Sequence, residues 1–216
     1  IESSGRWADA LAPNRGFAWA KIKLPNDHSL WAVSVHLLTA NDVTRSNEAT
    51  ALVAELKKVA APDDFIVVGG DFNTQVREEP CIKTFSELLD TNAPHPADQT
   101  GNEGTNALRT KPYDWVLVNP ALKSKQVPST IGSATRESGF VFDTRSFTPI
   151  TDAHPAAATD SAGENMQHMA VAHRQVVALE RLGLGVEQGA GHGGHGIGRQ
   201  RPAECRREPS EESRKS

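Results

Sequence analysis

Residues 65–74 read FIVVGGDFNT: four apolar residues, two glycines, and then an acidic and an amide residue two positions apart. The FIVV run has the length and β-branched content of a buried strand, and the glycines let the chain turn at its end. Asp71 and Asn73 project from one side of an extended segment, with Phe72 directed into the core between them. A carboxylate and an amide placed in this way can hold a water molecule, a hydrated Mg²⁺ or a phosphoryl oxygen. The alternative is an ordinary turn, because the same residue types often follow a strand.

The chain before this stretch supplies a neighbouring strand. Residues 30–36 read LWAVSVH, which is typical of a second buried strand, and residues 41–60 between the two have helical spacing of large apolar side chains. Three residues suit the N-cap of that helix: Asp42, Thr44 and Ser46. A strand, a helix and a strand within about 40 residues predict a βαβ unit with parallel strands. Both strands then end at one rim, where His36 and Asp71 would lie close together. In isolation, His36 is equally a histidine whose hydrogen bonds are satisfied at a strand end.

Later segments continue the alternation of strand and helix. The expected elements are a short helix over 82–89, a long polar loop over 94–111, and strands over 113–118, 140–143 and 169–177. The predicted fold class is therefore α/β.

Two further groups stand at the ends of these expected strands. Asp114 lies between two aromatic residues, where a partly desolvated carboxylate is most useful beside a cation or an imidazole, although it could also cap a turn. His168 directly precedes the last strand and could be a plain loop histidine. Arg109 and Lys111 precede Asp114, and they could neutralise a phosphate or be solvated.

Composition sets the outer limits. The chain has 216 residues, 38% of them hydrophobic, with a net charge of −4 that does not favour tight binding to a polyanion. No window is apolar enough for a transmembrane helix, and two cysteines form neither a disulfide framework nor a zinc pattern. Residues 180–216 hold eight of the seventeen glycines and few large apolar residues, which predicts a disordered tail after a domain over 1–179. His192 and His195 in that tail do not make a convincing metal site.

The order of SVHL (34–37), GGDFNT (69–74), YDWVLV (113–118) and QHMAV (167–171) resembles the endonuclease/exonuclease/phosphatase family. The resemblance covers roughly residues 15–178. Within the family, the sequence is most similar to bacterial members. It implies a four-layer α/β/β/α sandwich with its site at one rim of two packed sheets. It also implies hydrolysis of phosphodiesters or phosphomonoesters with Mg²⁺, for which Mn²⁺ or Ca²⁺ are alternatives. The expected partner is a phosphate ester of nucleic acid, phospholipid or inositol phosphate, bound by a monomer.

The resemblance also implies a role for each matching residue. His36 would contact the scissile phosphate or act as general acid, Asp71 would orient the attacking water, and Asn73 would hold a phosphate oxygen. Asp114 would pair with His168, which would act on the water or on the phosphorane. Two sets of ligands complete the expectation: Arg109 and Lys111 for the substrate, and Asp71, Asn73 and Gln167 for the metal.

Two departures from the family pattern bear on activity. Gln167 stands where the family usually has an aspartate that helps to hold the metal, and an amide carries no charge. The family also supplies an Asn and a metal-binding Glu upstream of the SVHL strand, whereas only 35 residues precede His36, and Glu2 does not match that Glu. We therefore expect the domain to lack its N-terminal part, roughly 80–100 residues judged from the resemblance. The 216-residue chain alone would then bind Mg²⁺ poorly, hydrolyse slowly or not at all, and tend to aggregate.

Three hypotheses remain at this point. The first is a metal-dependent phosphoesterase of this family, with nuclease-like phosphodiesterase activity favoured over lipid or sugar-phosphate substrates. The second is a non-catalytic fragment or pseudoenzyme that keeps the fold and binds a partner, which Gln167 and the absent Glu support. The third is an unrelated α/β binding domain whose motifs match by accident.

Overall fold

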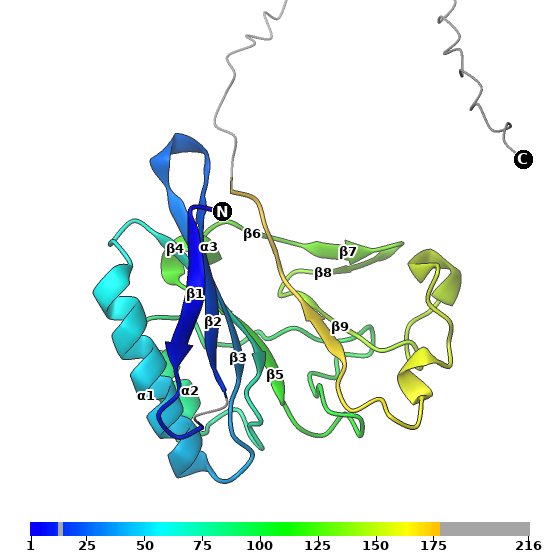
Figure 1. The fold of residues 1–216 in the computed structure, drawn as a ribbon. Helices are drawn as coiled ribbons and strands as arrows, with labels where there is room; N and C mark the ends of the chain where they lie inside the picture. Colours follow the sequence, from blue (N-terminus) through cyan, green and yellow to red (C-terminus); the bar gives the residue numbers. More distant parts are fainter. Residues whose placement is uncertain (13–14, 178–216) are drawn as a thin grey trace, which may run out of the picture. The chain divides into compact units, whose positions relative to one another are not determined.

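A computed structural model describes residues 1–12 and 15–177, so the predicted tail over 180–216 lies outside the described residues. Its main element is a five-stranded sheet in the order β1-β2-β3-β4-β5 (Figure 1). The strands are β1 (Ser3–Ala8), β2 (Gly16–Lys23), β3 (Ser29–His36), β4 (Phe65–Asp71) and β5 (Asp114–Val118). The pair β3–β4 is parallel and the other neighbours are antiparallel. The predicted parallel βαβ unit is thus confirmed.

One long helix and several short elements complete the described structure. The helices are α1 (Asp42–Val59), α2 (Pro80–Phe85) and α3 (Pro120–Lys123), with 3₁₀ turns at Pro25–Asp27, Ile150–Ala153 and Asp160–Ala162. The later strands are β6 (Gln126–Val127), β7 (Ser129–Ile131), β8 (Ala134–Arg136), β9 (Phe140–Phe142), β10 (Ala170–Ala172) and β11 (Arg174–Gln175), and they form three two-stranded sheets. In the described segments, no helix combines the length and the apolar character that a bilayer crossing requires.

Helix α1 starts because Asn41 caps it. The Asn41 side chain accepts a hydrogen bond from Thr44 N at 2.8 Å, which satisfies one of the unpaired amides of the first turn. The prediction that Asp42, Thr44 or Ser46 would be the N-cap is therefore wrong, because the helix begins one residue before the first of them could act. The helix ends at Val59, before Pro62.

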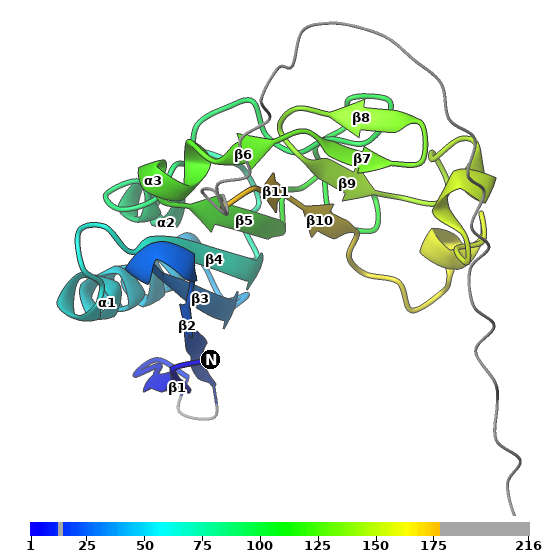
Figure 2. The ribbon, with the colours of Figure 1, turned by 90° about the horizontal axis from the view of Figure 1, so that it is seen from above.

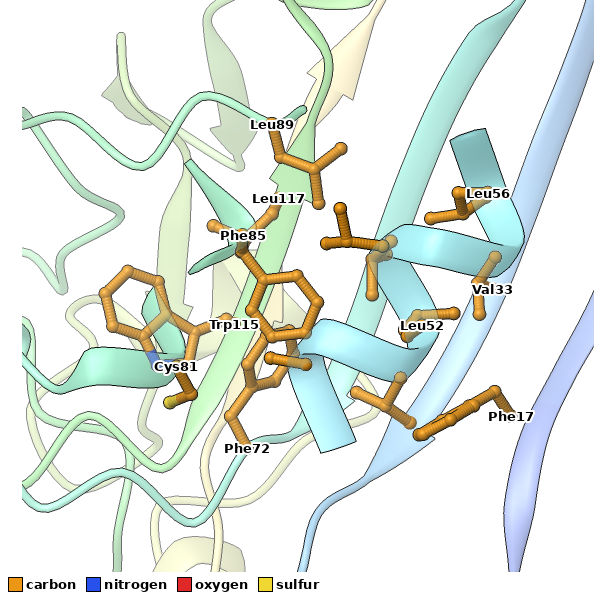
Figure 3. Close-up of a cluster of buried hydrophobic side chains, with 14 of the residues drawn as sticks. Phe17, Val33, Leu52, Leu56, Phe72, Cys81, Phe85, Leu89, Trp115 and Leu117 are labelled. Carbon is orange, nitrogen blue, oxygen red and sulfur yellow. The ribbon is translucent and has the colours of Figure 1, made fainter. Parts of the chain in front are cut away.

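The core lies between the sheet and the helices α1 and α2, which cover the same face of it (Figure 2). Phe72, directly after β4, is fully buried, as its alternation with Asp71 and Asn73 predicted. Its ring centroid lies 5.2 Å from that of Phe85 on α2, and both rings pack near Leu52 and Trp115 (Figure 3). Trp115 donates its indole N–H to Thr74 Oγ1 at 2.8 Å, so its burial leaves no unpaired donor.

Two expectations about the fold need adjustment. The strand expected over 169–177 is two strands, because the chain changes partner at His173: β10 pairs with β9, and β11 pairs with β6. The described residues form a mixed α/β structure in which α1 and α2 cover one face of the five-stranded sheet and the single turn α3 packs on Phe65 and Val118 of the other, so the four-layer sandwich is not confirmed. The strands β1 and β2, which the sequence did not predict, extend the sheet beyond β3.

Candidate active site

The sheet register sets three polar residues in one row at one end of the sheet. His36, the last residue of β3, lies opposite Asp71, the last residue of β4, and Asp71 lies opposite Asp114, the first residue of β5. His36 and Asp71 meet because parallel neighbours end together, and Asp114 joins them because β5 runs antiparallel and starts where β4 stops. His36 Nε2 lies 3.4 Å from Asp71 Oδ2.

His168 reaches the row from a loop distant in sequence. An antiparallel bridge between Asn106 and His168 fixes the loop that precedes β10. The imidazole Nδ1 lies 2.9 Å from Asp114 Oδ2, and Nε2 lies 3.7 Å from Asp71 Oδ2. The two imidazoles therefore face the same Asp71 oxygen, and a carboxylate backs His168 from the other side.

Asn73 is held in a conformation that serves the site. Its φ of 54° lies in the left-handed region, which Asn tolerates better than most residues. Its backbone N–H donates to Asp71 Oδ1 at 2.8 Å, and its side-chain Nδ2 donates to Leu37 O at 2.8 Å. The amide oxygen is then the Asn73 side-chain atom that remains available to a ligand.

These groups surround an open cleft of about 410 Å³. Its lining residues are His36, Thr39, Asp71, Asn73, Asn106, Ala107, Tyr113, Gln167 and His168. Asp114 does not line the cleft but lies behind His168. Burial raises the pKa of the Asp114 carboxyl above its ordinary value, and the nearby negative charge of Asp71 adds to this, while the hydrogen bond to His168 opposes it.

Sequence reasoning missed four lining residues: Thr39, Asn106, Ala107 and Tyr113. Asn106 had the clearest signal, since Asn in a polar loop often bonds to nearby backbone, and its Oδ1 accepts from Thr110 N and Lys111 N, both at 2.8 Å. This cap shapes the loop that bridges to His168.

A divalent cation fits this donor set. Asp71, Asp114 and His168 each offer a ligand atom within 4.8 Å of the others, and carboxylate oxygens suit Mg²⁺, Mn²⁺ and Ca²⁺. The cluster shares only Asp71 with the predicted set of Asp71, Asn73 and Gln167. Asn73 and Gln167 still line the same cleft, where their amide oxygens are further candidate ligands.

Arg109 does not line the cleft. Its guanidinium contacts Asp143 Oδ2 at 2.6 Å and Asp98 Oδ2 at 3.0 Å, and it also donates to two backbone carbonyls in residues 102–104. Both carboxylates are buried, so these contacts hold the polar loop together, and the substrate role of Arg109, which lines a groove beside the cleft, stays a prediction. Lys111 bonds to Gln75 Oε1 and lines a neighbouring groove of about 380 Å³, so its substrate role remains a prediction.

The contacts between Arg109 and Asp143 lead us to expect that the fold loses stability in acid. Although burial opposes it, hydrogen bonds from Arg145 and Arg109 lower the pKa of Asp143 to about 2. The folded pKa lies below the unfolded one, so the ionised carboxylate stabilises the fold above about pH 4 and loses that effect as the pH falls toward 2. Urea unfolding should show that Asp143→Asn costs about 2 kcal/mol at pH 5 and progressively less at pH 3 and below. A cost that does not change with pH would contradict this assignment.

Comparisons with known proteins give only partial structural likeness. No family model and none of the curated proteins matches the chain. An endonuclease/exonuclease/phosphatase from Bacteroides vulgatus is similar at 19% identity and a TM-score of 0.42, over 53% of this chain and 46% of that one. A Bacteroides thetaiotaomicron mannosyl-6-phosphatase is similar at 14% identity and a TM-score of 0.42, over 57% of this chain and 53% of that one. A Staphylococcus aureus beta toxin with bound magnesium ions is similar at 14% identity and a TM-score of 0.40, also over 57% of this chain and 53% of that one. The chain therefore spans about half the length of these structures.

Proposed function

We propose that the chain carries the catalytic cleft of a metal-dependent phosphoric ester hydrolase related to the endonuclease/exonuclease/phosphatase family. One observation carries the proposal: His36 and His168 face the same oxygen of Asp71, and Asp114 holds His168 from behind. Ester hydrolysis requires an in-line water, stabilisation of the phosphoryl oxygens and a proton for the leaving oxygen. This cleft offers a group for each requirement.

The hydrogen bonds suggest how the proton moves. With the proton on Nδ1 held by Asp114, His168 presents Nε2 to the cleft as a proton acceptor. Asp71 orients a water between the imidazoles, and that water attacks phosphorus as Nε2 takes its proton. The ester P–O bond then breaks, and His36 donates a proton to the leaving oxygen. Asn73 holds a phosphoryl oxygen.

A cation held by Asp71, with amide oxygens of Asn73 and Gln167 as further ligands, would supply positive charge against the charge that develops on the phosphoryl oxygens. Gln167 adds no negative charge, so metal affinity should be lower than in a site with three carboxylates.

The first experiment measures cleavage of bis-p-nitrophenyl phosphate and p-nitrophenyl phosphate with Mg²⁺, Mn²⁺ or Ca²⁺, and with EDTA as control. DNA, RNA, a phospholipid and an inositol phosphate then test the substrate class, for which we favour a phosphodiester of the nuclease type. Cleavage that requires the metal supports the proposal. If no cation raises cleavage of any of these esters, the second candidate, a non-catalytic binding module favoured by the uncharged Gln167, replaces it.

Asp114→Asn should lower metal-dependent cleavage by about 10²–10⁴-fold, because the amide no longer stabilises the imidazolium of His168 or fixes its tautomer. Asp90→Asn is the matched control, since Asp90 pairs with Lys123 outside the cleft and its loss should leave the rate within about twofold. Steady-state rates of both variants, with circular dichroism to verify folding, test the prediction. Equal rates for the two variants would remove Asp114 from the mechanism.

A further inference from the structure

The two loops that leave the parallel strands carry the site and are bonded to each other. After β3 the chain continues through Leu37 and Leu38, and after β4 it turns through Asn73 and Gln75. Leu37 N donates to Asp71 O at 2.9 Å, and Asn73 Nδ2 donates to Leu37 O at 2.8 Å. A shift of either loop therefore changes the position of His36 relative to Asp71.

A buried ion pair outside the cleft joins the same two loops. Arg45 on α1 donates from Nε to Glu79 Oε2 at 2.8 Å and from Nη2 to Glu79 Oε1 at 2.9 Å, so the contact is bidentate. The remaining guanidinium nitrogen donates to Leu38 O at 3.4 Å, while Glu79 also accepts from Gln75 N. One guanidinium thus contacts the loop after β3 directly and the loop after β4 through Glu79.

Glu48, one turn along α1, completes the contact to Leu38. Both of its carboxylate oxygens accept from Leu38 N, at 2.9 and 3.2 Å, and the side chain is only 1% exposed. Helix α1 therefore holds the N–H and the C=O of the same residue, two positions after His36.

Stability alone does not explain the buried pair. Arg45 is 3% exposed, and burial of two charges costs about as much as their attraction returns, so apolar side chains of similar size would serve the fold equally well. Neither Arg45 nor Glu79 lines the cleft, so neither can touch a substrate there. The pair instead fixes the positions of the two loops, because its four hydrogen bonds connect them.

We propose that Arg45 and Glu79 are positioning residues for the cleft, which hold His36 and the Asp71–Asn73 turn at their working separation. This inference rests on the proposed function for its kinetic consequence but not for its structural one. The planar guanidinium of Arg45 is essential to this positioning, because an ammonium group cannot make the same parallel hydrogen bonds.

The test compares the double variant Arg45→Met/Glu79→Met with a matched control, Lys57→Met/Glu87→Met. The control removes an exposed ion pair, 2.7 Å long, that joins α1 to the segment just after α2. Three quantities are measured for each: the urea midpoint, the imidazole ¹H–¹⁵N signals, and kcat and KM for bis-p-nitrophenyl phosphate. We expect the Arg45/Glu79 double variant to keep a midpoint near that of the parent. We also expect its His36 signals to shift and its kcat to fall by about 10²-fold with KM within about threefold. The control should change none of these.

Parent His36 signals and parent kcat in a folded double variant would overturn the proposal. Should that variant not fold, Arg45→Lys keeps the charge and loses the planar guanidinium, and the same shift of His36 with loss of kcat is expected. If the parent chain itself cleaves no ester, the proposed function fails, and the His36 signals alone decide the positioning role: a shift supports it, and unchanged signals reject it.

Discussion

Replacement of Asp71 by Asn is expected to abolish metal-dependent ester cleavage, with a loss of at least about 10³-fold. Asp71 Oδ2 is the atom that both imidazoles face, at 3.4 and 3.7 Å, and it belongs to the only group of candidate metal ligands found in the described residues. The amide oxygen of Asn can still accept from Asn73 N, as Oδ1 does now, so the turn after β4 should survive. The expected loss is therefore chemical and not structural.

Asp152→Asn provides the control for this substitution. Asp152 caps Ser133 in an exposed loop, so the same chemical change there should leave the rate unaffected. The measurement is the initial rate with saturating cation, together with a thermal unfolding curve for each variant. A rate for Asp71→Asn within about threefold of the parent would show that this carboxylate takes no part in cleavage.

Gly70→Ala is expected to give the largest loss of stability, about 3–5 kcal/mol of unfolding free energy. Gly70 has φ 144°, which side-chain-bearing residues rarely adopt, and a Cβ there would lie 2.0 Å from Val35 O in the neighbouring strand. Because that oxygen belongs to the backbone of β3, no side-chain rotation can relieve the contact. The strain falls on the residue before Asp71, so the substitution should also weaken the site.

Gly69→Ala tests the same pair of glycines without the clash. A Cβ at Gly69 would lie 3.5 Å from Trp115 O, an ordinary van der Waals contact, so its cost should stay within about 1 kcal/mol. Urea unfolding of the two variants measures the difference directly. Equal unfolding free energies would mean that β4 does not need glycine at its end.

The part of the fold that could be predicted is the part that one short sequence window determines. The runs LWAVSVH and FIVV are too apolar to lie at the surface, and the helix between them forces a crossover that makes parallel strands the natural result. Once β3 and β4 are parallel, His36 and Asp71 must end at the same edge, and the structure pairs them in register.

Elements that depend on distant partners escaped prediction. Strand β1 is mostly exposed and contains Ser3, Ser4, Gly5 and Arg6, so no hydrophobic pattern reveals it; it exists because β2 pairs with it. The break at His173 likewise follows from a change of partner between β9 and β6, which no local pattern encodes.

The same distinction applies to the site. Motif order suggested which groups belong together, but the use of Arg109 depends on Asp98 and Asp143, which lie 11 and 34 residues away and take up its guanidinium. A basic residue beside a motif can equally contact a substrate or stabilise its own loop, and only the positions of the nearby carboxylates distinguish the two. The ion pair of Arg45 and Glu79 could not be predicted either, since the two residues are 34 positions apart in the sequence.

We propose that one cleft, lined by His36, Asp71 and His168 and backed by Asp114, holds a divalent cation. Titration with Mn²⁺, followed through the imidazole NMR signals of all eight histidines, tests it most directly because paramagnetic broadening detects even weak binding close to the ion. We predict that His168 and His36 broaden first, and that Asp71→Asn removes this selectivity. If these two signals stay sharp while those of His192, His195 or other histidines broaden, the cation binds elsewhere and the account is wrong.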